Sequence, residues 1–365
     1  MSETIFINGR FLTQPITGVQ RYAREIVTRL ILLEPDRFCV LMPRGDFSNI
    51  SDLLRSRVQQ LGQFQGHLWE QLELGPYVQW RRGLLYSPTM SNPILVSKQI
   101  FTVQDLFVLE YPEWVGLNFH RWYSWLLPKL IRRSKPIVAG SLYAKGEIAR
   151  RFLLPADSIQ VIPCGVDLKF APANAMERQR VKAKYQLPEH FFLSLGSLEP
   201  RKNLKNLIDA WLNLPESDRW PLLIAGKLGA NQVFGDFDSS SLMRAGHDIR
   251  ILGYVPDDDL PGLYSSANVF TYVSLLEGFG LPPLEAAACG AKVLTSNNSG
   301  MLEVMGGFAT LVDPLNVQSV TEGFLAAMNA PAPSSEQCLL LRQRYDWDVS
   351  AQKLLDILNH QLSSG

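Results

Sequence analysis

The chain has 365 residues, of which 46% are hydrophobic and 19% charged, and its 35 basic and 35 acidic residues give no net charge. This length favours two domains, and the composition is that of a folded protein. No apolar run reaches 18 residues, and the N-terminus enters a strand without a basic, cleavable leader, so we expect a cytoplasmic protein. The cysteines form no C-x-x-C pair, which argues against a zinc site or a disulfide framework: Cys39, Cys164, Cys289 and Cys338.

The charge is distributed unevenly along the chain. Residues 1–165 carry 19 Lys+Arg and 13 Asp+Glu, a balance of +6, whereas residues 166–365 carry 16 and 22, a balance of −6. A basic first half favours an acidic partner or an anionic membrane surface, although two halves can also differ without consequence. We expect no nucleic-acid partner.

Strand-like and helix-like patterns alternate from the start of the chain, which predicts α/β domains with parallel sheets. A helix is expected over residues 17–30, with Gly18 at its entrance. Gln104 directly follows a predicted strand, and its amide can hydrogen-bond a hydroxyl but cannot act as a base. The strands expected in this part are residues 4–8, 38–42 and 99–103.

The segment 117–133 is rich in aromatic residues and ends in basic ones. It fits contact with a membrane or a lipid-linked acceptor, and it also fits the more usual case of a helix whose aromatic side chains pack in the core. Pro163 and Gly165, followed by Pro172, mark a hinge between domains. The hinge divides the chain into residues 1–170 and 171–345.

The second half begins with a polar helix, about residues 175–186, and a strand over 191–195. The strand leads into a glycine loop that contains Ser197, Arg201 and Lys202. A strand, a loop with two cations and a following helix are typical of a diphosphate-binding site, although a solvated helix start has the same pattern.

Two clusters of aspartates in this half have different interpretations. Asp236 and Asp238 form an Asp-x-Asp pattern in a Gly/Ser-rich loop, which is too short a motif to indicate a metal site. Asp257 to Asp259 precede an apolar helix, so we expect an N-cap there. The sequence therefore predicts no metal and no cofactor.

The most informative stretch is Glu277-Gly-Phe-Gly-Leu-Pro-Pro-Leu-Glu285, which follows a strand over 268–274 and opens a helix that Gly290 closes. A helix N-terminus attracts anions, and glycines let a ligand approach the backbone closely. Carboxylates would repel a phosphate but accept hydrogen bonds from sugar hydroxyls. Either glutamate alone fits an ordinary surface position, whereas both together favour a sugar nucleotide.

This stretch resembles the Glu-x7-Glu signature of retaining family-4 glycosyltransferases. Ile159-Gln-Val-Ile-Pro-Cys-Gly-Val-Asp167 and the Arg-Lys-Asn sequence ending at Asn203 resemble other segments of that family. The resemblance implies the GT-B fold, with two Rossmann-like domains that have parallel sheets and face each other across a cleft. It also implies that residues 1–170 bind the acceptor, that residues 171–345 bind the nucleotide sugar, and that a helix in 346–365 returns to the first domain.

The resemblance assigns a role to each matching residue. Lys202 binds the diphosphate, with Arg201 as a second cation because Ser197 stands where the family often has one. Glu277 contacts the donor sugar and Glu285 the ribose. Gln104 replaces the family's histidine beside the sugar, which puts an acid–base role there in doubt. The catalytic candidates are Lys202, Arg201, Glu277 and Gln104, and the donor-binding candidates are Gly18, Ser197, Lys202, Tyr254, Val255, Glu277, Gly278, Phe279, Gly280, Leu281 and Glu285.

The function implied is transfer of a hexose from a GDP- or UDP-sugar, mannose being slightly favoured, with retention and without a metal. The acceptor would be a glycan or a lipid-linked sugar in cell-surface polysaccharide synthesis, with the basic first domain able to contact the inner face of the plasma membrane. Two alternatives stay open: a nucleotide-sugar-binding protein with weak or no catalysis, motivated by Gln104 and Ser197, and a sugar-nucleotide epimerase.

Overall fold

The computed structural model describes residues 4–46, 50–196, 199–226 and 248–363. The chain divides into two compact units. The first holds residues 1–109, 121–165 and 346–365, and the second holds residues 110–120 and 166–345. The main boundary therefore lies between Gly165 and Val166, a few residues before the position expected from the hinge pattern, and the segment 346–365 belongs to the first unit.

The first unit contains a parallel sheet in the order β3-β2-β1-β4-β5-β6-β7. The chain builds β2 and β3 on one side of β1 and then continues with β4 on the other side, so the direction of winding reverses between β1 and β4. The central strands are buried on both faces, which explains their continuous apolar sequences. The strands are β1 (Ile5–Asn8), β2 (Phe38–Met42), β3 (Val58–Gln60), β4 (Leu84–Ser87), β5 (Gln99–Val103), β6 (Ile137–Ala139) and β7 (Ile159–Val161).

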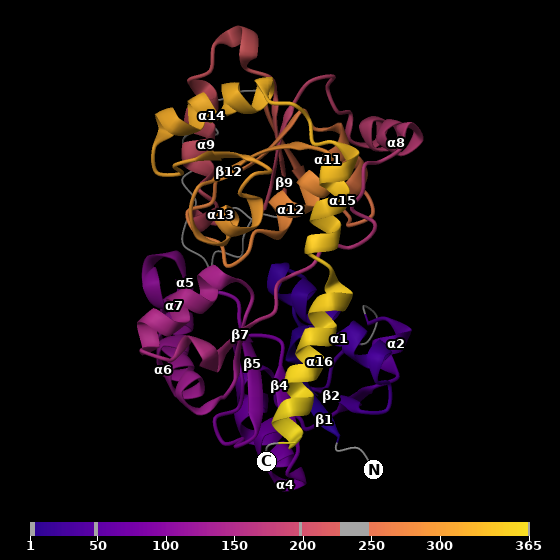
Figure 1. The fold of residues 1–365 in the computed structure, drawn as a ribbon, viewed down its shortest axis with the longest axis vertical. Helices are drawn as coiled ribbons and strands as arrows, with labels where there is room; N and C mark the ends of the chain where they lie inside the picture. The colour runs from indigo at the N-terminus through magenta and orange to yellow at the C-terminus, as the bar shows by residue number, and fades with distance from the viewer. Residues whose placement is uncertain (1–3, 47–49, 197–198, 227–247, 364–365) are drawn as a thin grey trace. The chain divides into compact units, whose positions relative to one another are not determined.

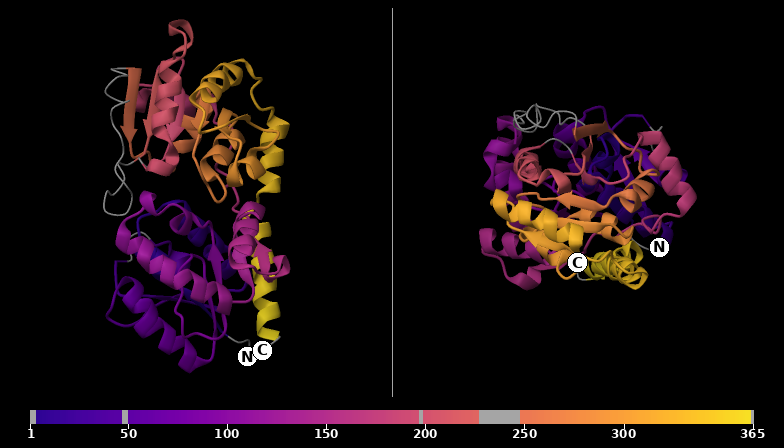
Figure 2. Two further views of the ribbon diagram at one scale, coloured as in Figure 1. Left: turned by 90° about the vertical axis from the view of Figure 1, so that its left-hand side faces the viewer. Right: turned by 90° about the horizontal axis from the view of Figure 1, so that it is seen from above.

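Helix α1 (Gly18–Leu33) buries Tyr22, Ile26 and Leu30, the face that its helical periodicity predicts. The C-terminal helix α16 (Trp347–Ser363) packs against α1, and the Tyr22 and Trp347 rings lie 5.9 Å apart. Figures 1 and 2 show α16 running along the first unit beside α1. The other helices wholly or partly in this unit are α2 (Asp52–Arg55), α3 (Gly66–Trp69), α4 (Gly75–Arg81), α5 (Phe107–Glu110), α6 (Leu117–Arg133) and α7 (Leu142–Phe152).

Helix α6 combines features of both interpretations of its aromatic sequence. It buries one face, formed by Tyr123, Leu126, Leu127, Leu130 and Ile131. Trp125 is 48% exposed, and the ammonium group of Lys129 lies 3.6 Å from the centre of its ring. The helix therefore packs as a core element on one side and presents a tryptophan and basic residues on the other. No helix in the described part of the chain is long and apolar enough to cross a membrane.

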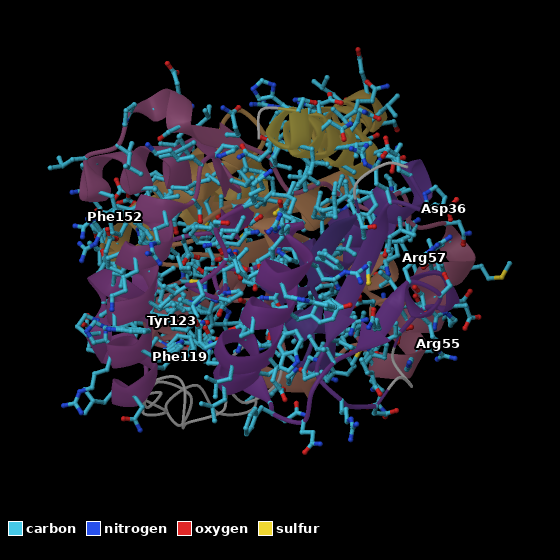
Figure 3. The ribbon with its side chains drawn as sticks, turned by 90° about the horizontal axis from the view of Figure 1, so that it is seen from below. Asp36, Arg55, Arg57, Phe119, Tyr123 and Phe152 are labelled. Carbon is cyan, nitrogen blue, oxygen red and sulfur yellow. The ribbon has the colours of Figure 1, made fainter. Side chains whose placement is uncertain are left out.

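An ion pair links the segments that precede β2 and β3 at the edge of this sheet. Arg57, which precedes β3, forms an ion pair of 3.0 Å with Asp36, which precedes β2 (Figure 3). These elements between residues 50 and 95 are three to seven residues long, which is too short to show a helical or alternating pattern in the sequence.

The second unit contains a parallel sheet in the order β10-β9-β8-β11-β12-β13. The winding reverses between β8 and β11. Helices α9 and α14 cover the sheet with an apolar core that includes Trp211 and Phe324. The strands are β8 (Phe192–Leu195), β9 (Leu222–Ala225), β10 (Ile249–Gly253), β11 (Val269–Tyr272), β12 (Lys292–Ser296) and β13 (Thr310–Val312), and the helices are α8 (Ala175–Tyr185), α9 (Leu204–Leu212), α11 (Leu260–Ser266), α12 (Leu281–Ala288), α13 (Ser299–Met305), α14 (Val317–Asn329) and α15 (Ser335–Arg344).

The N-cap predicted in this unit is confirmed in position, but its expected side-chain hydrogen bond is absent. Asp259 occupies the N-cap position of α11, but its side chain makes no capping hydrogen bond. Its carboxylate accepts instead from Arg180 at 2.7 Å, Lys184 at 2.5 Å and Tyr185 at 2.7 Å on α8. Burial raises the pKa of Asp259, but these three donors outweigh it and lower the pKa to about 2. The aspartate therefore ties two helices together, because cations close in space outcompete the local backbone amides.

Candidate functional site

The candidate site lies in the second unit at the carboxyl ends of β8 and β11, where the winding of the sheet reverses. In open α/β sheets this switch point is the usual place for a ligand. Strand β8 leads into the short 3-10 turn Pro200–Lys202, and β11 leads to Glu277. The two segments are more than seventy residues apart in the sequence, and the pairing of β8 with β11 brings them together.

Glu277 is the centre of this site. Its Oε1 accepts from Lys202 Nζ at 2.5 Å, from Arg201 Nη1 at 3.0 Å and from Tyr272 Oη at 2.9 Å. Lys202 also donates to the hydroxyl of Tyr272. None of the described residues donates to Oε2 of Glu277. One carboxylate oxygen is therefore anchored by two cations, and the other is available to a ligand hydroxyl.

The ionisation of these groups follows from their contacts. Burial raises the pKa of Glu277, but the cations of Arg201 and Lys202 outweigh it and lower the pKa to about 2. Burial and the Arg201 charge lower the pKa of Lys202, while Glu277 partly restores it. Burial and the Glu277 carboxylate raise the pKa of Tyr272 well above its ordinary value, so its hydroxyl keeps the proton that it donates. The site therefore holds two cations, Arg201 and Lys202, against the carboxylate of Glu277, and Arg201 is also paired with Glu199.

The loop that carries the cations is held by hydrogen bonds from Asn203 and Leu275 and by an ion pair with Glu199. Asn203 adopts a left-handed conformation with φ 57°, and its Nδ2 donates to the carbonyl oxygens of Val273 at 3.0 Å and Pro314 at 2.7 Å. Arg201 donates from Nε to Glu199 at 2.8 Å, and its carbonyl oxygen accepts from the N–H of Leu275 at 2.8 Å. These bonds fix the Arg201–Lys202 pair next to β11.

The glycine loop 278–280 follows Glu277 and precedes α12. The backbone N–H of Gly300 donates to the Glu277 carbonyl oxygen at 3.0 Å, and Gly280 has φ 100°, a conformation that suits glycine. Phe279 is buried against the ring of Tyr345. Pro282 and Pro283 have no N–H, so the backbone donors at this helix start come from Phe279, Gly280 and Leu281.

Glu285 lies inside α12 and is buried. Its Oε2 accepts a hydrogen bond from Tyr264 Oη at 3.1 Å. A buried carboxyl group needs such a partner, because burial removes the water that would otherwise hydrogen-bond it. The two glutamates of the motif thus lie on either side of the glycine loop and have different partners. Glu277 accepts from two cations, and Glu285 accepts from the hydroxyl of Tyr264.

The remaining candidates are distributed as follows. After β10, Tyr254 is 61% exposed, whereas Val255 is buried. Gly18 is the first residue of α1 and Gln104 follows β5, and both belong to the first unit. Gln104 is buried, and its Nε2 has no hydrogen-bond partner within the described residues. Ser197, Asp236 and Asp238 lie outside the described residues.

Comparison with known proteins decides the family. The model of Glycosyl transferases group 1 matches residues 176–339, and that of Glycosyltransferase Family 4 matches residues 91–170. O-antigen chain mannosyltransferase B of Escherichia coli is 28% identical, over 93% of this chain and 97% of its own length. The chain belongs to the family-4 glycosyltransferases.

Other comparisons agree with this glycosyltransferase family. The serotype-specific mannosyltransferase WbdA of Escherichia coli is 29% identical over 99% of this chain, which spans 45% of that longer protein. The structure of Anabaena Alr3699/HepE in complex with UDP and glucose has a TM-score of 0.75 at 16% identity, over 99% of this chain and 100% of its own. Sucrose-phosphate synthase from Thermosynechococcus elongatus has a TM-score of 0.77 at 18% identity, over 100% of both chains. The glycosyltransferase has the GT-B fold that the resemblance implies.

Sequence reasoning missed three residues of this glycosyltransferase that hold the predicted ones. Tyr272 and Tyr264 donate to the two glutamates, and Asn203 positions the cation loop. Tyr272 stands at the end of a buried strand, where an aromatic residue is ordinary, so its hydroxyl gives no signal. Among the described residues there is no group of three or more His, Cys, Asp or Glu side chains arranged for a metal ion.

Proposed function

We propose that this glycosyltransferase transfers a hexose, mannose being favoured, from a nucleoside-diphosphate sugar to a glycan or lipid-linked acceptor with retention of configuration. The proposal includes a place in cell-surface polysaccharide synthesis. Relatives named as O-antigen mannosyltransferases support the sugar and the pathway. A structural neighbour that binds UDP supports a nucleotide-sugar donor, which would carry either GDP or UDP.

The observation that carries the proposal is the asymmetry of Glu277. Its Oε1 accepts from both Lys202 and Arg201, and its Oε2 receives no hydrogen bond from the described residues. A sugar hydroxyl bonded to Oε2 would lie next to two cations suited to the diphosphate. Negative charge grows on the diphosphate as the bond to the sugar breaks, so these cations would stabilise the transition state more than the ground state.

A donor panel tests this function. The protein is incubated with GDP-mannose, GDP-fucose, UDP-glucose and UDP-galactose, each with and without octyl α-D-mannopyranoside, and free nucleotide and glycosylated product are measured. We expect one donor to give acceptor-dependent nucleotide release and a product whose anomeric configuration, read by NMR, matches the donor. Binding without turnover would instead support a catalytically inactive binding protein, and a sugar epimer released without transfer would support an epimerase.

We further propose that no divalent metal is required. The support is that Lys202 and Arg201 supply two positive charges where other enzymes use a metal ion to neutralise a diphosphate. Turnover should therefore persist in EDTA. Complete loss of turnover in EDTA with recovery on adding Mn²⁺ would contradict this and return attention to Asp236 and Asp238.

We also propose a peripheral contact of the first unit with the inner face of the plasma membrane. The support is one exposed side of α6 where Arg121, Trp125, Lys129 and Arg132 recur every three or four residues. Tryptophan and basic residues together suit an anionic lipid surface. The double variant Trp125→Ala/Lys129→Ala should lose sedimentation with phosphatidylglycerol vesicles, whereas Trp80→Ala, at an exposed tryptophan of α4, should keep it. Equal sedimentation of all three proteins would contradict this contact.

A further inference from the structure

The first unit has a second charged network, at its own switch point. Asn8 ends β1 and Arg10 follows it, while Ser91 lies in the segment after β4. Because the winding of this sheet reverses between β1 and β4, these residues occupy the place where open α/β sheets bind ligands. In the second unit the corresponding place holds Glu277 and Lys202.

The network is built around Glu70, whose side chain is 0% exposed. One oxygen accepts from Asn8 Nδ2 at 2.8 Å and faces Arg10 Nε at 3.1 Å. The other accepts from Ser91 Oγ at 2.5 Å and contacts His67 Nδ1 at 2.8 Å. Burial raises the pKa of Glu70, but Arg10 and then His67 and Ser91 outweigh it, so the pKa is lowered and the group is an anion.

A buried carboxylate is a costly way to stabilise a fold, because desolvation removes much of the gain from its ion pairs. Such networks are better explained by the positions that they impose on other side chains. Glu70 also begins a π-helical turn (Glu70–Leu74), and single π turns inside helices occur often at functional sites. The side chain that this network positions toward the surface is His67, which is 27% exposed.

The hydrogen bonds assign the tautomer of His67. An ionised Glu70 only accepts, so Nδ1 of His67 must carry the proton of their 2.8 Å bond. In the neutral imidazole, Nε2 then presents a lone pair. Its partner among the described residues is Arg10 Nη1 at 3.4 Å, a long contact that a better-placed donor can replace. The network therefore holds a hydrogen-bond acceptor at the switch point, with a guanidinium group beside it.

Aromatic rings complete the surroundings of His67. The Trp122 ring lies 4.9 Å from the imidazole, and the Tyr123 ring, on α6 (Figure 3), lies 5.6 Å away at 80°. Nε1 of Trp122 is buried and has no hydrogen-bond partner within the described residues. An imidazole acceptor, a guanidinium donor and aromatic rings suit a sugar ring, since it offers hydroxyls at its edge and C–H groups on its face.

We propose that His67 and Trp122 are specificity-determining residues for the acceptor sugar, with His67 Nε2 accepting a hydrogen bond from an acceptor hydroxyl and Trp122 packing against the sugar ring. Glu70 is a positioning residue that fixes the His67 ring. This inference rests on the proposed glycosyltransferase function and names the residues that select its acceptor.

Two substitutions of His67 separate substrate binding from a structural role. In His67→Gln the amide lies near the position of Nε2, so it can still accept from the acceptor sugar. In His67→Asn the amide lies near Nδ1, so it can still donate to Glu70 but loses the surface acceptor. Acceptor KM for octyl α-D-mannopyranoside, the Kd of the bare nucleoside diphosphate and acceptor-independent nucleotide release are measured for both variants.

We expect His67→Asn to raise the acceptor KM about 10-fold, the effect of one lost hydrogen bond, and His67→Gln to restore most of that loss. The nucleotide Kd and acceptor-independent release should stay within about twofold of the unsubstituted protein. An acceptor KM for His67→Gln as high as that for His67→Asn, or higher, would overturn the proposal. If either variant does not fold, the acceptor KM of Trp122→Phe is measured instead. An unchanged acceptor KM would overturn the proposal, and a raised acceptor KM would support it.

The same measurements distinguish a wrong acceptor site from a wrong enzymatic function. If the unsubstituted protein glycosylates the mannoside but the His67 variants do not differ, only the acceptor site is wrong. If no donor supports transfer, the proposed function is wrong, and binding of octyl α-D-mannopyranoside is then measured by saturation-transfer NMR. Loss of that binding in His67→Asn and its return in His67→Gln would keep the sugar site, and equal binding would remove it.

Discussion

The two carboxylate oxygens of Glu277 have different surroundings, and this determines the expected effect of its substitution. Removing the side chain takes away the anion paired with Lys202 and one of the two anions paired with Arg201, so both cations become more available to a diphosphate. It also removes the oxygen proposed to hold a sugar hydroxyl. The effects on nucleotide and on donor therefore have opposite directions.

The first prediction compares Glu277→Ala with Lys202→Ala. Glu277→Ala should bind the bare nucleoside diphosphate as tightly as the unsubstituted protein or more tightly, while turnover of the sugar donor falls. Lys202→Ala should weaken both ligands and lower kcat by about 10²-fold, as expected for loss of a charge stabilising the leaving group. Calorimetry with nucleotide and steady-state kinetics with donor check this, and circular dichroism controls for folding. If Glu277→Ala lost nucleotide affinity as severely as Lys202→Ala, the sugar would not lie beside Glu277.

The second prediction concerns Glu285. If it holds ribose hydroxyls, Glu285→Ala should weaken nucleotide binding by about 1–3 kcal/mol, the cost of leaving a buried partner unpaired. Tyr264→Phe removes the hydrogen bond to Glu285 and keeps the carboxylate, so it serves as the matched control and should weaken binding less. Calorimetry with the nucleoside diphosphate decides, since equal affinity for Glu285→Ala and the unsubstituted protein would exclude the ribose role.

The loop before α12 depends on a backbone conformation available to few residues. Gly280 has φ 100°, and a Cβ there would lie 3.2 Å from Met301 Cγ. Gly18 also stands at the start of a helix, α1, but a Cβ there would meet no atom within 4 Å. The backbone conformation therefore favours glycine at position 280 but not at position 18, although both were predicted as donor-binding residues.

The third prediction follows from this contrast. Gly280→Ala should lower the free energy of unfolding by roughly 1–2 kcal/mol, because an L side chain disfavours the left-handed region. Gly18→Ala should leave stability unchanged or raise it by up to about 1 kcal/mol, since alanine favours a helix. Urea denaturation of both variants measures this. A Gly280→Ala protein as stable as Gly18→Ala would show that the loop adapts without cost.

At the scale of the whole molecule, the chain ends in the unit where it begins. Helix α16 buries Trp347, Leu354 and Leu358, and a Cβ on Gly165 would lie 2.5 Å from the Trp347 backbone nitrogen. Arg29 of α1 forms an ion pair of 2.7 Å with Asp348. The C-terminal helix is therefore part of the core of the first unit, although the sequence separates the two by the entire second unit.

The fourth prediction is that removal of residues 346–365 destabilises the first unit selectively. Hydrogen exchange should become faster in α1, which loses its packing partner, and should remain slow in α9 and α14 of the second unit. Trp347→Ala gives a milder version of the same change, because it removes one large buried side chain. Equally faster exchange in α9 and α14 would show that the helix stabilises the chain as a whole.

Several features were predictable from the sequence because they depend on neighbouring residues. The strand before Glu277, the glycine loop and α12 follow from local apolar, glycine and proline patterns, and the structure confirms them as β11, Gly280 with positive φ, and α12. Helix α1 follows from its apolar periodicity in the same way. By contrast, the short elements between residues 50 and 95 have no periodicity, and α15 buries only Cys338 and Leu341, so neither was predicted.

The sequence by itself determined the α/β class, the family motif and the identity of the two glutamates and two cations. Tertiary structure alone decided which of them touch. Lys202 meets Glu277 because β8 and β11 are neighbours in the sheet, and Glu70 meets Arg10 because its π-helical turn lies against the end of β1. For the same reason, the side chain of Asp259 accepts from Arg180 and Lys184 and does not cap the backbone of α11. Local sequence patterns predict backbone conformation. Ion pairs form between charged residues that the order of strands brings within a few ångströms of each other, and a local pattern contains no information about that distance.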